Sequence, residues 1–334
     1  MEYRQFGRTG MRVSELCLGA MTFGREADEE TSRRIVDHFL AAGGNFIDTA
    51  DGYGARPGLS EQIVGRALAG RRDDVIVATK VRFPTGPGRN DAGLSRRHIR
   101  MGVESSLRNL GTDWIDLYQV HCWDPSTPLE ETLGTLDDLV REGKVRYLGA
   151  SNFAAWHLAK ALGVSAIHSW EPFSSLQPTY SLVTRDIERE LLPLCLSEGL
   201  AVIPYGPLAG GILTGKYTAG QEPPPGTRAA GGEMAARGMS LGLNKRGFAI
   251  VDALRVVAKE AGRTPAQVAL KWVATRQGVT APILGARSVQ QLEDNVGVLG
   301  WDLDPELEAQ LDSASHIRLG YPYDFHTWMD QVGF

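Results

Sequence analysis

The sequence predicts an α/β chain folded as a (β/α)8 TIM barrel with a short N-terminal β-hairpin and a C-terminal tail. Short apolar runs alternate with longer segments in which apolar residues recur every three or four positions, a pattern typical of βα units around a parallel sheet. Eight such runs are present, which favours a closed barrel over an open sheet. We therefore expect residues 1–334 to form a single barrel domain.

The eight apolar runs are expected to be buried strands, and the opening of the chain is expected to pair as a hairpin. The hairpin joins residues 3–6 to residues 11–13 across a turn with glycine at both ends. The predicted barrel strands are residues 15–18, 45–48, 75–79, 115–120, 145–149, 174–177, 201–204 and 281–284.

Helix-length amphipathic segments separate these runs, and their ends carry capping signals. Asp28 is placed to open one helix that Gly43-Gly44 closes, and Thr264-Pro265 places a cap and a first-turn proline at the start of another. Residues 223–242, rich in Pro, Gly and Ala, are predicted to be a mobile loop. Predicted helices include residues 28–42, 59–68, 95–110 and 129–142.

Composition and charge narrow the classes of partner. The chain is 43% hydrophobic and 22% charged, with a formal net charge of −5. It lacks the excess of Lys and Arg with which proteins bind nucleic acid or an anionic membrane. We therefore expect a small-molecule partner, whereas the oligomeric state is not predicted by any feature of the sequence.

The cysteines and the N-terminal segment bear on cellular location and metal binding. Cys17, Cys122 and Cys195 are widely spaced, which argues against a disulfide framework and a zinc site. No H-E-x-x-H motif or other compact His/Cys cluster occurs, so no metal is expected. The N-terminal segment lacks the apolar core of a signal peptide, and no run approaches the roughly 20 apolar residues of a membrane helix. We expect a cytoplasmic protein.

Four ionisable residues stand at or just after the ends of successive predicted strands. Asp48 ends the second strand, Tyr53 follows in its loop, Lys80 comes directly after the third strand and His121 directly after the fourth. Barrel enzymes place their active sites at the carboxyl ends of the strands. These four side chains are therefore expected to converge at one mouth of the barrel.

Their chemistry predicts a proton donor. A charged Lys80 in the core needs a partner, and Asp48 one strand away can supply it. An ammonium beside the Tyr53 phenol is expected to lower its pKa from about 10 towards the range useful to a general acid. His121 is expected to donate a hydrogen bond to a substrate carbonyl. Considered alone, Tyr53 is also compatible with an aromatic residue at the surface, His121 with a hydrogen-bonded core histidine and Lys80 with a solvated residue at a strand end. Their occurrence together at successive strand ends favours catalysis.

The chain also resembles a known family over nearly its whole length. The segments LCLGAMTFG, FIDTADGYG, VIVATK, DLYQVH, GASNF, VIPYGPLAGGILTGKY and PILGARSVQQLEDN occur in this order and are similar to those of the aldo-keto reductase superfamily. The resemblance implies an NADP-dependent oxidoreductase that reduces aldehydes and ketones. It assigns the catalytic tetrad to Asp48, Tyr53, Lys80 and His121, with Tyr53 as the proton donor.

The resemblance further implies an NADPH site spread over the loops at the barrel mouth. Amide side chains suit a carboxamide, small residues allow close backbone approach, and the fork of Arg287 suits a 2′-phosphate. Tyr205 is assigned to stack on the nicotinamide. The implied cofactor-binding residues are Gly19, Ala20, Met21, Asp48, Ser151, Asn152, Gln177, Tyr205, Gly206, Pro207, Leu208, Gly210, Lys216, Arg228, Gly285, Arg287, Gln291, Asp294 and Asn295.

The substrate pocket is less well determined by the sequence. Phe23, Phe83 and Trp123 lie near strand ends and are candidates to line it together with Tyr53 and His121. The aromatic tail, residues 321–328, is either a cover over the mouth or ordinary packing.

Other functions have weaker support in the sequence. The stretch from Gly52 to Gly58 nearly matches a dinucleotide-binding fingerprint, but its last glycine is one residue late. The sequence contains no Tyr-x-x-x-Lys motif, which argues against a short-chain dehydrogenase. The ancillary β-subunits of potassium channels resemble the same superfamily, so an NADPH-binding redox-sensing or ancillary subunit with little turnover is the alternative. The lack of a long N-terminal inactivating segment favours an independent enzyme.

Overall fold

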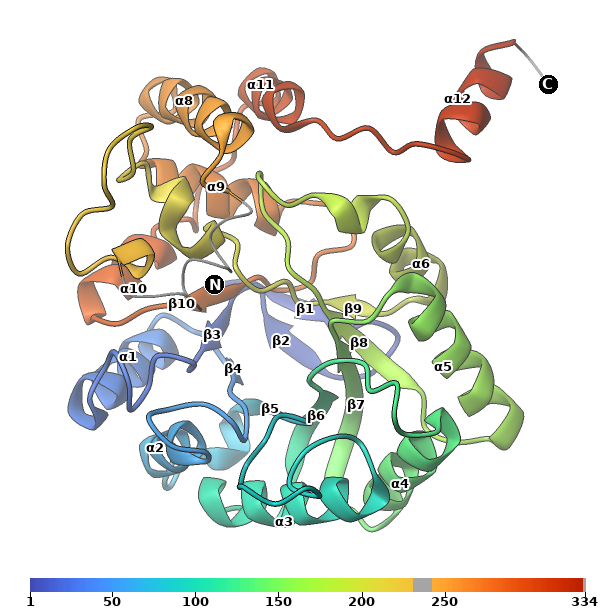
Figure 1. Ribbon diagram of the computed structural model, residues 1–334. Helices are drawn as coiled ribbons and strands as arrows, with labels where there is room; N and C mark the ends of the chain where they lie inside the picture. Colours follow the sequence, from blue (N-terminus) through green and yellow to red (C-terminus); the bar gives the residue numbers. More distant parts are fainter. Residues whose placement is uncertain (231–241, 333–334) are drawn as a thin grey trace.

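An eight-stranded parallel sheet forms the centre of the protein in a computed structural model (Figure 1). The structure describes residues 1–230 and 242–332. The strands follow the order β10-β3-β4-β5-β6-β7-β8-β9. The Thr280 amide donates to the Val202 carbonyl and the Ile283 amide to the Pro204 carbonyl, each at 2.8 Å. These bonds join the two ends of the sheet, so the fold is the predicted (β/α)8 barrel.

A strand is found at each of the eight predicted positions. The shortest, β9, ends two residues before Pro204, and β10 directly follows Pro282; prolines lack an amide hydrogen for the ladder. The barrel strands are β3 (Cys17–Gly19), β4 (Phe46–Asp48), β5 (Ile76–Val81), β6 (Ile115–Val120), β7 (Val145–Ser151), β8 (Phe173–Gln177), β9 (Ala201–Val202) and β10 (Ile283–Gly285).

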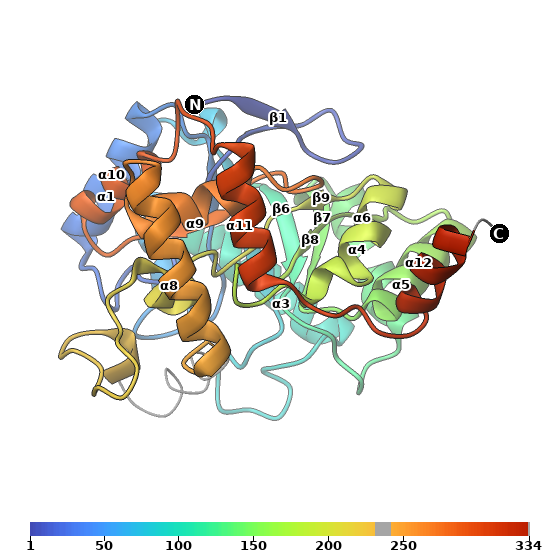
Figure 2. The same ribbon diagram turned by 90° about the horizontal axis from the view of Figure 1, so that it is seen from above.

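The predicted hairpin is confirmed at the N-terminus. β1 (Tyr3–Gln5) pairs antiparallel with β2 (Arg12–Ser14). Its fully buried Phe6 and Val13 pack with side chains from inside the barrel. In Figure 2 the hairpin lies at one end of the barrel and the long loops at the other. The hairpin therefore closes the floor and leaves the C-terminal mouth for chemistry.

Helices surround the sheet, and the predicted caps are present. The Asp28 carboxylate accepts from the Thr31 amide at 2.8 Å, and Thr264 forms a capping box with Gln267 ahead of Pro265. The described α-helices are α1 (Glu29–Ala41), α2 (Leu59–Ala67), α3 (Arg96–Leu110), α4 (Leu129–Arg141), α5 (Ala155–His168), α6 (Leu191–Glu198), α8 (Lys245–Glu260), α9 (Pro265–Ala274), α10 (Val289–Val296), α11 (Pro305–Ser315) and α12 (Tyr323–Val332). No helix in the described ranges is both long and apolar enough to cross a bilayer.

Two segments outside the barrel core, residues 223–242 and 321–328, carried predictions of their own. Of the predicted mobile loop, residues 231–241 lie outside the described residues, so mobility stays a prediction. The aromatic tail, offered as a cover over the mouth or as ordinary packing, does neither. It forms α12, which has no buried residue and stands at the periphery in both views (Figures 1 and 2).

Candidate active site

The four predicted catalytic side chains meet at the C-terminal mouth of the barrel. Asp48 ends β4, Lys80 lies near the end of β5, and Tyr53 and His121 come from the loops after β4 and β6. Lys80 is fully buried, and only 3% of Asp48 and 6% of His121 are exposed. Neighbouring parallel strands end at the same edge, which is why residues 73 positions apart in sequence, Asp48 and His121, share one site.

Lys80 is held by an ion pair inside the barrel. Its Nζ donates to Asp48 Oδ1 at 2.5 Å and to the Thr49 carbonyl at 2.8 Å. Asp48 Oδ2 accepts from the side-chain amides of Gln119 at 2.9 Å and Gln177 at 2.8 Å. Both oxygens of the carboxylate thus accept hydrogen bonds, as a buried charge requires. The sequence analysis missed Gln119, whose signal was an amide inside an otherwise largely apolar strand.

Tyr53 lies between this ion pair and His121. Its hydroxyl is 3.4 Å from His121 Nε2, and Lys80 Nζ is 5.0 Å from the centroid of its ring. The rings of Tyr53 and His121 meet edge to face with centroids 5.6 Å apart. The phenol, ammonium, carboxylate and imidazole therefore form one cluster.

The pKa of Tyr53 departs from the expectation. Burial raises the pKa of Tyr53, and the charge of Lys80 and its hydrogen bond to the phenol lower it. The net direction is upward, so the predicted lowering was wrong for the protein without ligands, because desolvation of the phenolate outweighs the ammonium. Burial also acts to lower the pKa of Lys80, but the charge of Asp48, its hydrogen bond and the nearby Tyr53 together offset it, and the pKa is raised. Lys80 therefore stays charged beside a protonated phenol.

His121 is a neutral imidazole in this site. Burial, with the positive charges of Lys80 and Arg82, lowers its pKa to about 2. A neutral ring carries one N–H donor. His121 can therefore polarise a carbonyl oxygen by hydrogen bonding, but it does not bring a positive charge to the site at neutral pH.

Asn152 joins several residues assigned to the nicotinamide end of the cofactor. Its Nδ2 donates to the His121 carbonyl at 2.9 Å and to Ser151 Oγ at 3.0 Å. Its Oδ1 accepts from the Tyr205 hydroxyl at 2.9 Å, and Tyr205 lies near enough to Tyr53 for their charges to interact. Ser151 ends β7 and Tyr205 follows β9. The structure thus brings this predicted group beside the tetrad.

Small residues shape the backbone at the end of β3 and in the loop after Tyr205. Gly19 ends β3, and a Cβ there would lie 2.6 Å from the Ile283 side chain. Gly206 and Gly210 adopt positive φ angles of 67° and 66°, which glycine tolerates best. Ala20, Met21, Pro207, Leu208 and Lys216 flank these positions, with Met21 and Tyr205 each 36% exposed.

The predicted adenosine-end residues form a second group on β10 and α10. The Arg287 amide donates to Gln291 Oε1 at 3.1 Å, and Asn295 Nδ2 donates to the Gly285 carbonyl at 3.3 Å. Arg287 Nη1 donates to the Gly226 carbonyl at 3.0 Å, and Asp294 lies on the same helix. Arg228 begins the short helix η4 (Arg228–Ala230), but its side chain lies outside the described part of the chain.

The candidate substrate residues separate into two kinds. Phe23 is fully buried in the main core, so its expected place in a pocket wall is corrected: it packs under the loop after β3. Phe83 is 37% exposed, and its ring centroid is 4.2 Å from that of His121. Trp123 is half-buried and stacks on His157 with centroids 4.0 Å apart. Phe83 is therefore the aromatic residue nearest the tetrad in this set.

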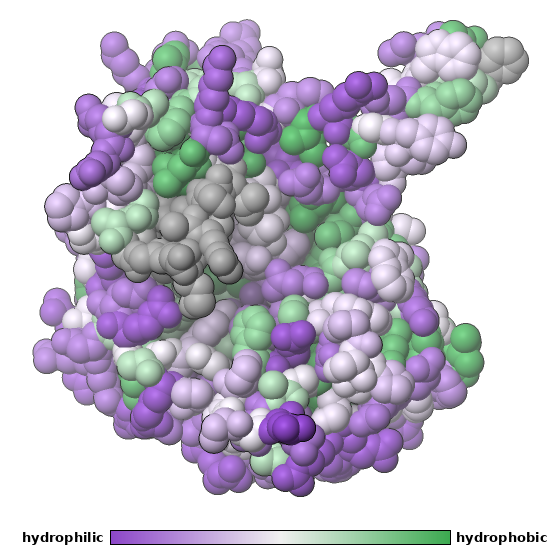
Figure 3. Space-filling view, viewed as in Figure 1, coloured by the Kyte–Doolittle hydropathy of each residue, from purple (hydrophilic) through white to green (hydrophobic). Residues whose placement is uncertain are grey.

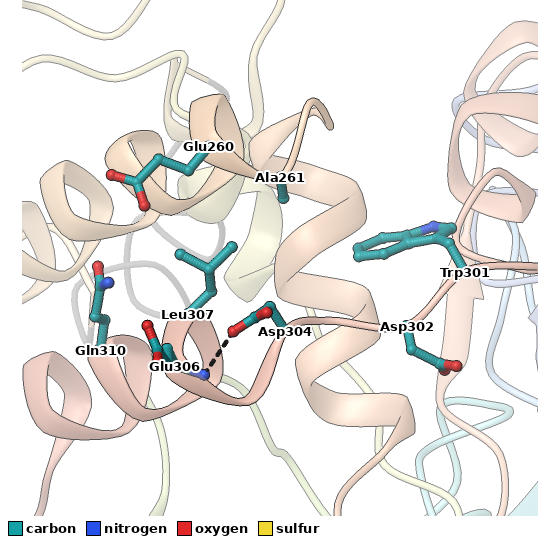
Figure 4. Close-up of a pocket in the computed structure, with 8 residues that line it drawn as sticks. All are labelled: Glu260, Ala261, Trp301, Asp302, Asp304, Glu306, Leu307 and Gln310. Atoms are coloured by element: carbon teal, nitrogen blue, oxygen red, sulfur yellow. Dashed lines mark hydrogen bonds between the residues drawn. The ribbon is translucent and has the colours of Figure 1, made fainter.

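One cavity lies well away from the mouth, between α8 and α11. It has a volume of about 400 Å³, and Figure 4 shows acidic side chains around it with Trp301 at one side. Asp304 caps α11, since its carboxylate accepts from the Glu306 amide at 2.8 Å. No group of three or more His, Cys, Asp or Glu side chains among the described residues is placed to hold a metal. Its lining contains no Lys, His or Tyr, so the barrel mouth is the stronger candidate for a reactive site.

A second cavity adjoins the Tyr53 loop and leads to two buried acids that the sequence analysis missed. It has a volume of about 680 Å³ and Asp51 in its lining. Glu61 accepts from the Thr79 hydroxyl at 2.6 Å and from Asn109 Nδ2 at 2.9 Å. Neither carboxylate oxygen of Asp51 has a hydrogen-bond partner of normal geometry among the described residues. Burial and the charge of Glu61 raise the pKa of Asp51 well above its ordinary range.

The substitution Asp51→Asn is expected to raise the free energy of unfolding by about 1–3 kcal/mol at pH 8, because the folded wild type must either keep this buried carboxyl protonated or bear an unpaired charge, and an uncharged amide avoids that cost. The folded chain holds a proton on Asp51 that the unfolded chain has lost, so wild-type stability falls as pH rises from the ordinary aspartate range towards the folded pKa. Urea unfolding between pH 4 and pH 9 measures this, with the exposed Asp73→Asn as control. A gain of equal size at all pH values contradicts the explanation.

Comparison with known proteins agrees with this geometry. A model of the Aldo/keto reductase family matches residues 15–316. The chain is 42% identical over 321 residues to the oxidoreductase YrpG of Bacillus subtilis, covering 93% of this chain and 95% of that protein. It is 36% identical to a norsolorinic acid reductase of Emericella nidulans, with 95% and 82% covered. It is 35% identical to a probable voltage-gated potassium channel subunit beta of Arabidopsis thaliana, with 89% and 90% covered. The chain therefore belongs to the aldo/keto reductase family.

Proposed function

We propose that this oxidoreductase reduces an aldehyde or ketone to the alcohol with NADPH, and that Tyr53 is the general acid. The observation that carries the proposal is the buried Lys80–Asp48 ion pair beside the Tyr53 phenol, which itself lies 3.4 Å from the neutral His121. An ion pair buried in a barrel core is costly to keep. Its position beside a phenol at the barrel mouth gives it a chemical use.

The residues at the mouth suit NADPH. Tyr205 presents a partly exposed aromatic face near Tyr53, and the amides of Asn152 and Gln177 are of the kind that binds a carboxamide. Glycines with positive φ next to Tyr205 allow a bulky group to approach the backbone closely. When bound, the reduced nicotinamide supplies the hydride that the carbonyl carbon accepts.

The roles of the chain's own residues follow from their placement. Tyr53 and His121 hold the carbonyl oxygen between the phenol O–H and an imidazole N–H. As negative charge develops on that oxygen, both hydrogen bonds strengthen, and Tyr53 transfers its proton to give the alcohol. Lys80 stabilises the phenolate that remains until solvent returns the proton, while Asp48 holds Lys80 in position. Phe83 covers His121 and offers an apolar contact to the substrate.

Turnover separates this function from the alternative. We expect the purified protein to bind NADPH and to consume it on addition of aldehydes and ketones of graded size, followed by loss of cofactor fluorescence. The similarity to a potassium channel subunit beta supports the alternative of an ancillary, redox-sensing subunit. Binding of NADPH without turnover of any carbonyl compound favours that alternative and contradicts our proposal.

The preference for NADPH is assigned to Arg287. We expect Arg287→Ala to raise the KM for NADPH by about 10-fold or more, since a charge-assisted hydrogen bond contributes about 1.5–3 kcal/mol, and to change the KM for NADH by less than about 2-fold. Arg12→Ala, in the hairpin at the opposite end of the barrel, is the control. Equal increases for both cofactors refute a role for Arg287 in binding the 2′-phosphate.

A further inference from the structure

The C-terminal helix α12 presents an apolar stripe to solvent. Phe325, Trp328, Met329 and Val332 follow the i, i+3, i+4, i+7 spacing that places side chains on one helix face. Phe325 is 51% exposed, Trp328 53% and Val332 46%, and Phe325 and Trp328 contact each other with ring centroids 5.7 Å apart. A stripe of this kind normally packs against another element.

The start of α12 is held in place, so the stripe projects from a fixed point. The Asp324 carboxylate accepts from Arg318 Nε at 2.7 Å and from the Gly320 amide at 3.2 Å. The Tyr323 hydroxyl donates to Glu190 Oε1, next to α6, at 3.2 Å. Figure 3 shows the helix as an arm that stands away from the body, with hydrophobic atoms on it. A free helix of only ten residues is marginal in water, which indicates that α12 packs on a surface outside its own fold.

The outer face of α5 has the complementary form. Its exposed positions are almost free of charge and combine two large side chains with small ones between them, so a second helix can approach closely. No atom lies within 4 Å of where a Cβ at Gly163 would be, and Trp156 and Ile167 at the two ends are 62% and 79% exposed. The exposed residues on this face are Trp156, Ala159, Lys160, Gly163, Ala166 and Ile167.

The charges of the two helices are also complementary. α12 carries Asp330 beside its apolar stripe and no Lys or Arg, whereas its other acid, Asp324, is paired with Arg318. α5 carries Lys160 on its exposed face and no Asp or Glu anywhere along its length. At about 1.5 Å per residue, the ten residues of α12 fit along the fourteen of α5.

We propose that the apolar stripe of α12 in one copy of this chain docks on the outer face of α5 of a second copy. Both the stripe and the α5 face are on the same chain, and both are exposed within it. A two-fold axis then forms the contact twice, with each copy giving its α12 and receiving the other. This dimer does not depend on the catalytic function proposed above.

The mass of the full chain in solution tests the proposal first. Sedimentation at micromolar concentration is expected to give a dimer. Phe325→Ser/Trp328→Ser is expected to raise the dimer dissociation constant by about 100-fold or more, because buried aromatic anchors dominate such contacts. Val256→Ser, which removes a 53% exposed side chain on α8, should leave the dimer unchanged. A monomeric wild type, or a double variant that still dimerises normally, overturns the proposal.

Cross-linking then distinguishes a second copy from the chain's own α5. Met329→Cys, which keeps both aromatic anchors, and Gly163→Cys are made in separate chains, mixed and oxidised, and a disulfide-linked pair of doubled mass is expected. Met329→Cys mixed with Val256→Cys should give no such product. If the mixture of Met329→Cys and Gly163→Cys yields no doubled mass while the two substitutions in one chain form an internal disulfide, α12 docks on its own barrel and the proposal is wrong.

Discussion

Replacing Lys80 with methionine is expected to lower the free energy of unfolding by about 3–5 kcal/mol, the cost of leaving a buried charge without its partner. Asp48 is 3% exposed and would keep only the two amide donors of Gln119 and Gln177. Urea unfolding at pH 7 measures the loss. Lys144→Met, which removes a lysine paired with Glu104 at the surface, should cost less than about 1 kcal/mol.

The double variant Lys80→Met/Asp48→Asn sharpens this test. Replacing both members of a buried pair by neutral groups of similar size is often nearly neutral for stability. We therefore expect the double variant to recover most of the stability that Lys80→Met loses, and to remain inactive. A double variant as unstable as the single one means that the cost arises from lost packing of the lysine side chain and not from the unpaired carboxylate.

Tyr53→Phe is expected to lower kcat by about 100- to 10,000-fold, the usual contribution of a positioned general acid, and to leave the dissociation constant of NADPH unchanged. The substitution removes one hydroxyl and keeps the ring that contacts Lys80 and His121. Steady-state kinetics with a reactive aldehyde and a cofactor titration measure the two effects. Tyr147→Phe, near the start of β7, is the matched control, and an equal loss there contradicts a special role for Tyr53.

Much of the fold follows from local sequence patterns. Parallel strands buried on both faces are continuous apolar runs, so the runs ending at Asp48 and Val120 located β4 and β6 closely. Capping is equally local, which is why Asp28 and Thr264 marked helix starts correctly. The convergence of the tetrad could also be predicted, because the order of strands around a barrel decides which strand ends are neighbours.

The features that the sequence did not predict depend on tertiary packing, that is, on which side chains lie together in the folded chain. The support of Asp48 by Gln119 requires knowing that Gln119 points into the barrel. The fully buried Phe23 looked like a pocket residue because its position at a strand end says nothing about what covers it. The pKa of Tyr53 depends on the balance between burial and the charge of Lys80, and only the extent of burial decides that balance.

The position of α12 could not be predicted from local sequence patterns either. Its aromatic residues indicated either a cover over the mouth or ordinary packing, and the sequence did not distinguish the two. Contacts of Asp324 and Tyr323 instead fix the helix at the periphery. The contact of Tyr323 is a tertiary interaction between segments far apart in sequence, since it bonds to Glu190, 133 residues earlier.

A single-turnover measurement tests the central claim, proton donation by Tyr53, most directly, because product release often limits kcat and can hide the chemical step. The protein is loaded with NADPH and mixed rapidly with excess aldehyde, and the loss of cofactor fluorescence is followed. We predict fast decay in the wild type and decay slower by about 100-fold or more in Tyr53→Phe, with equal starting fluorescence. Decay at the wild-type rate in Tyr53→Phe would contradict the assignment of the proton donor.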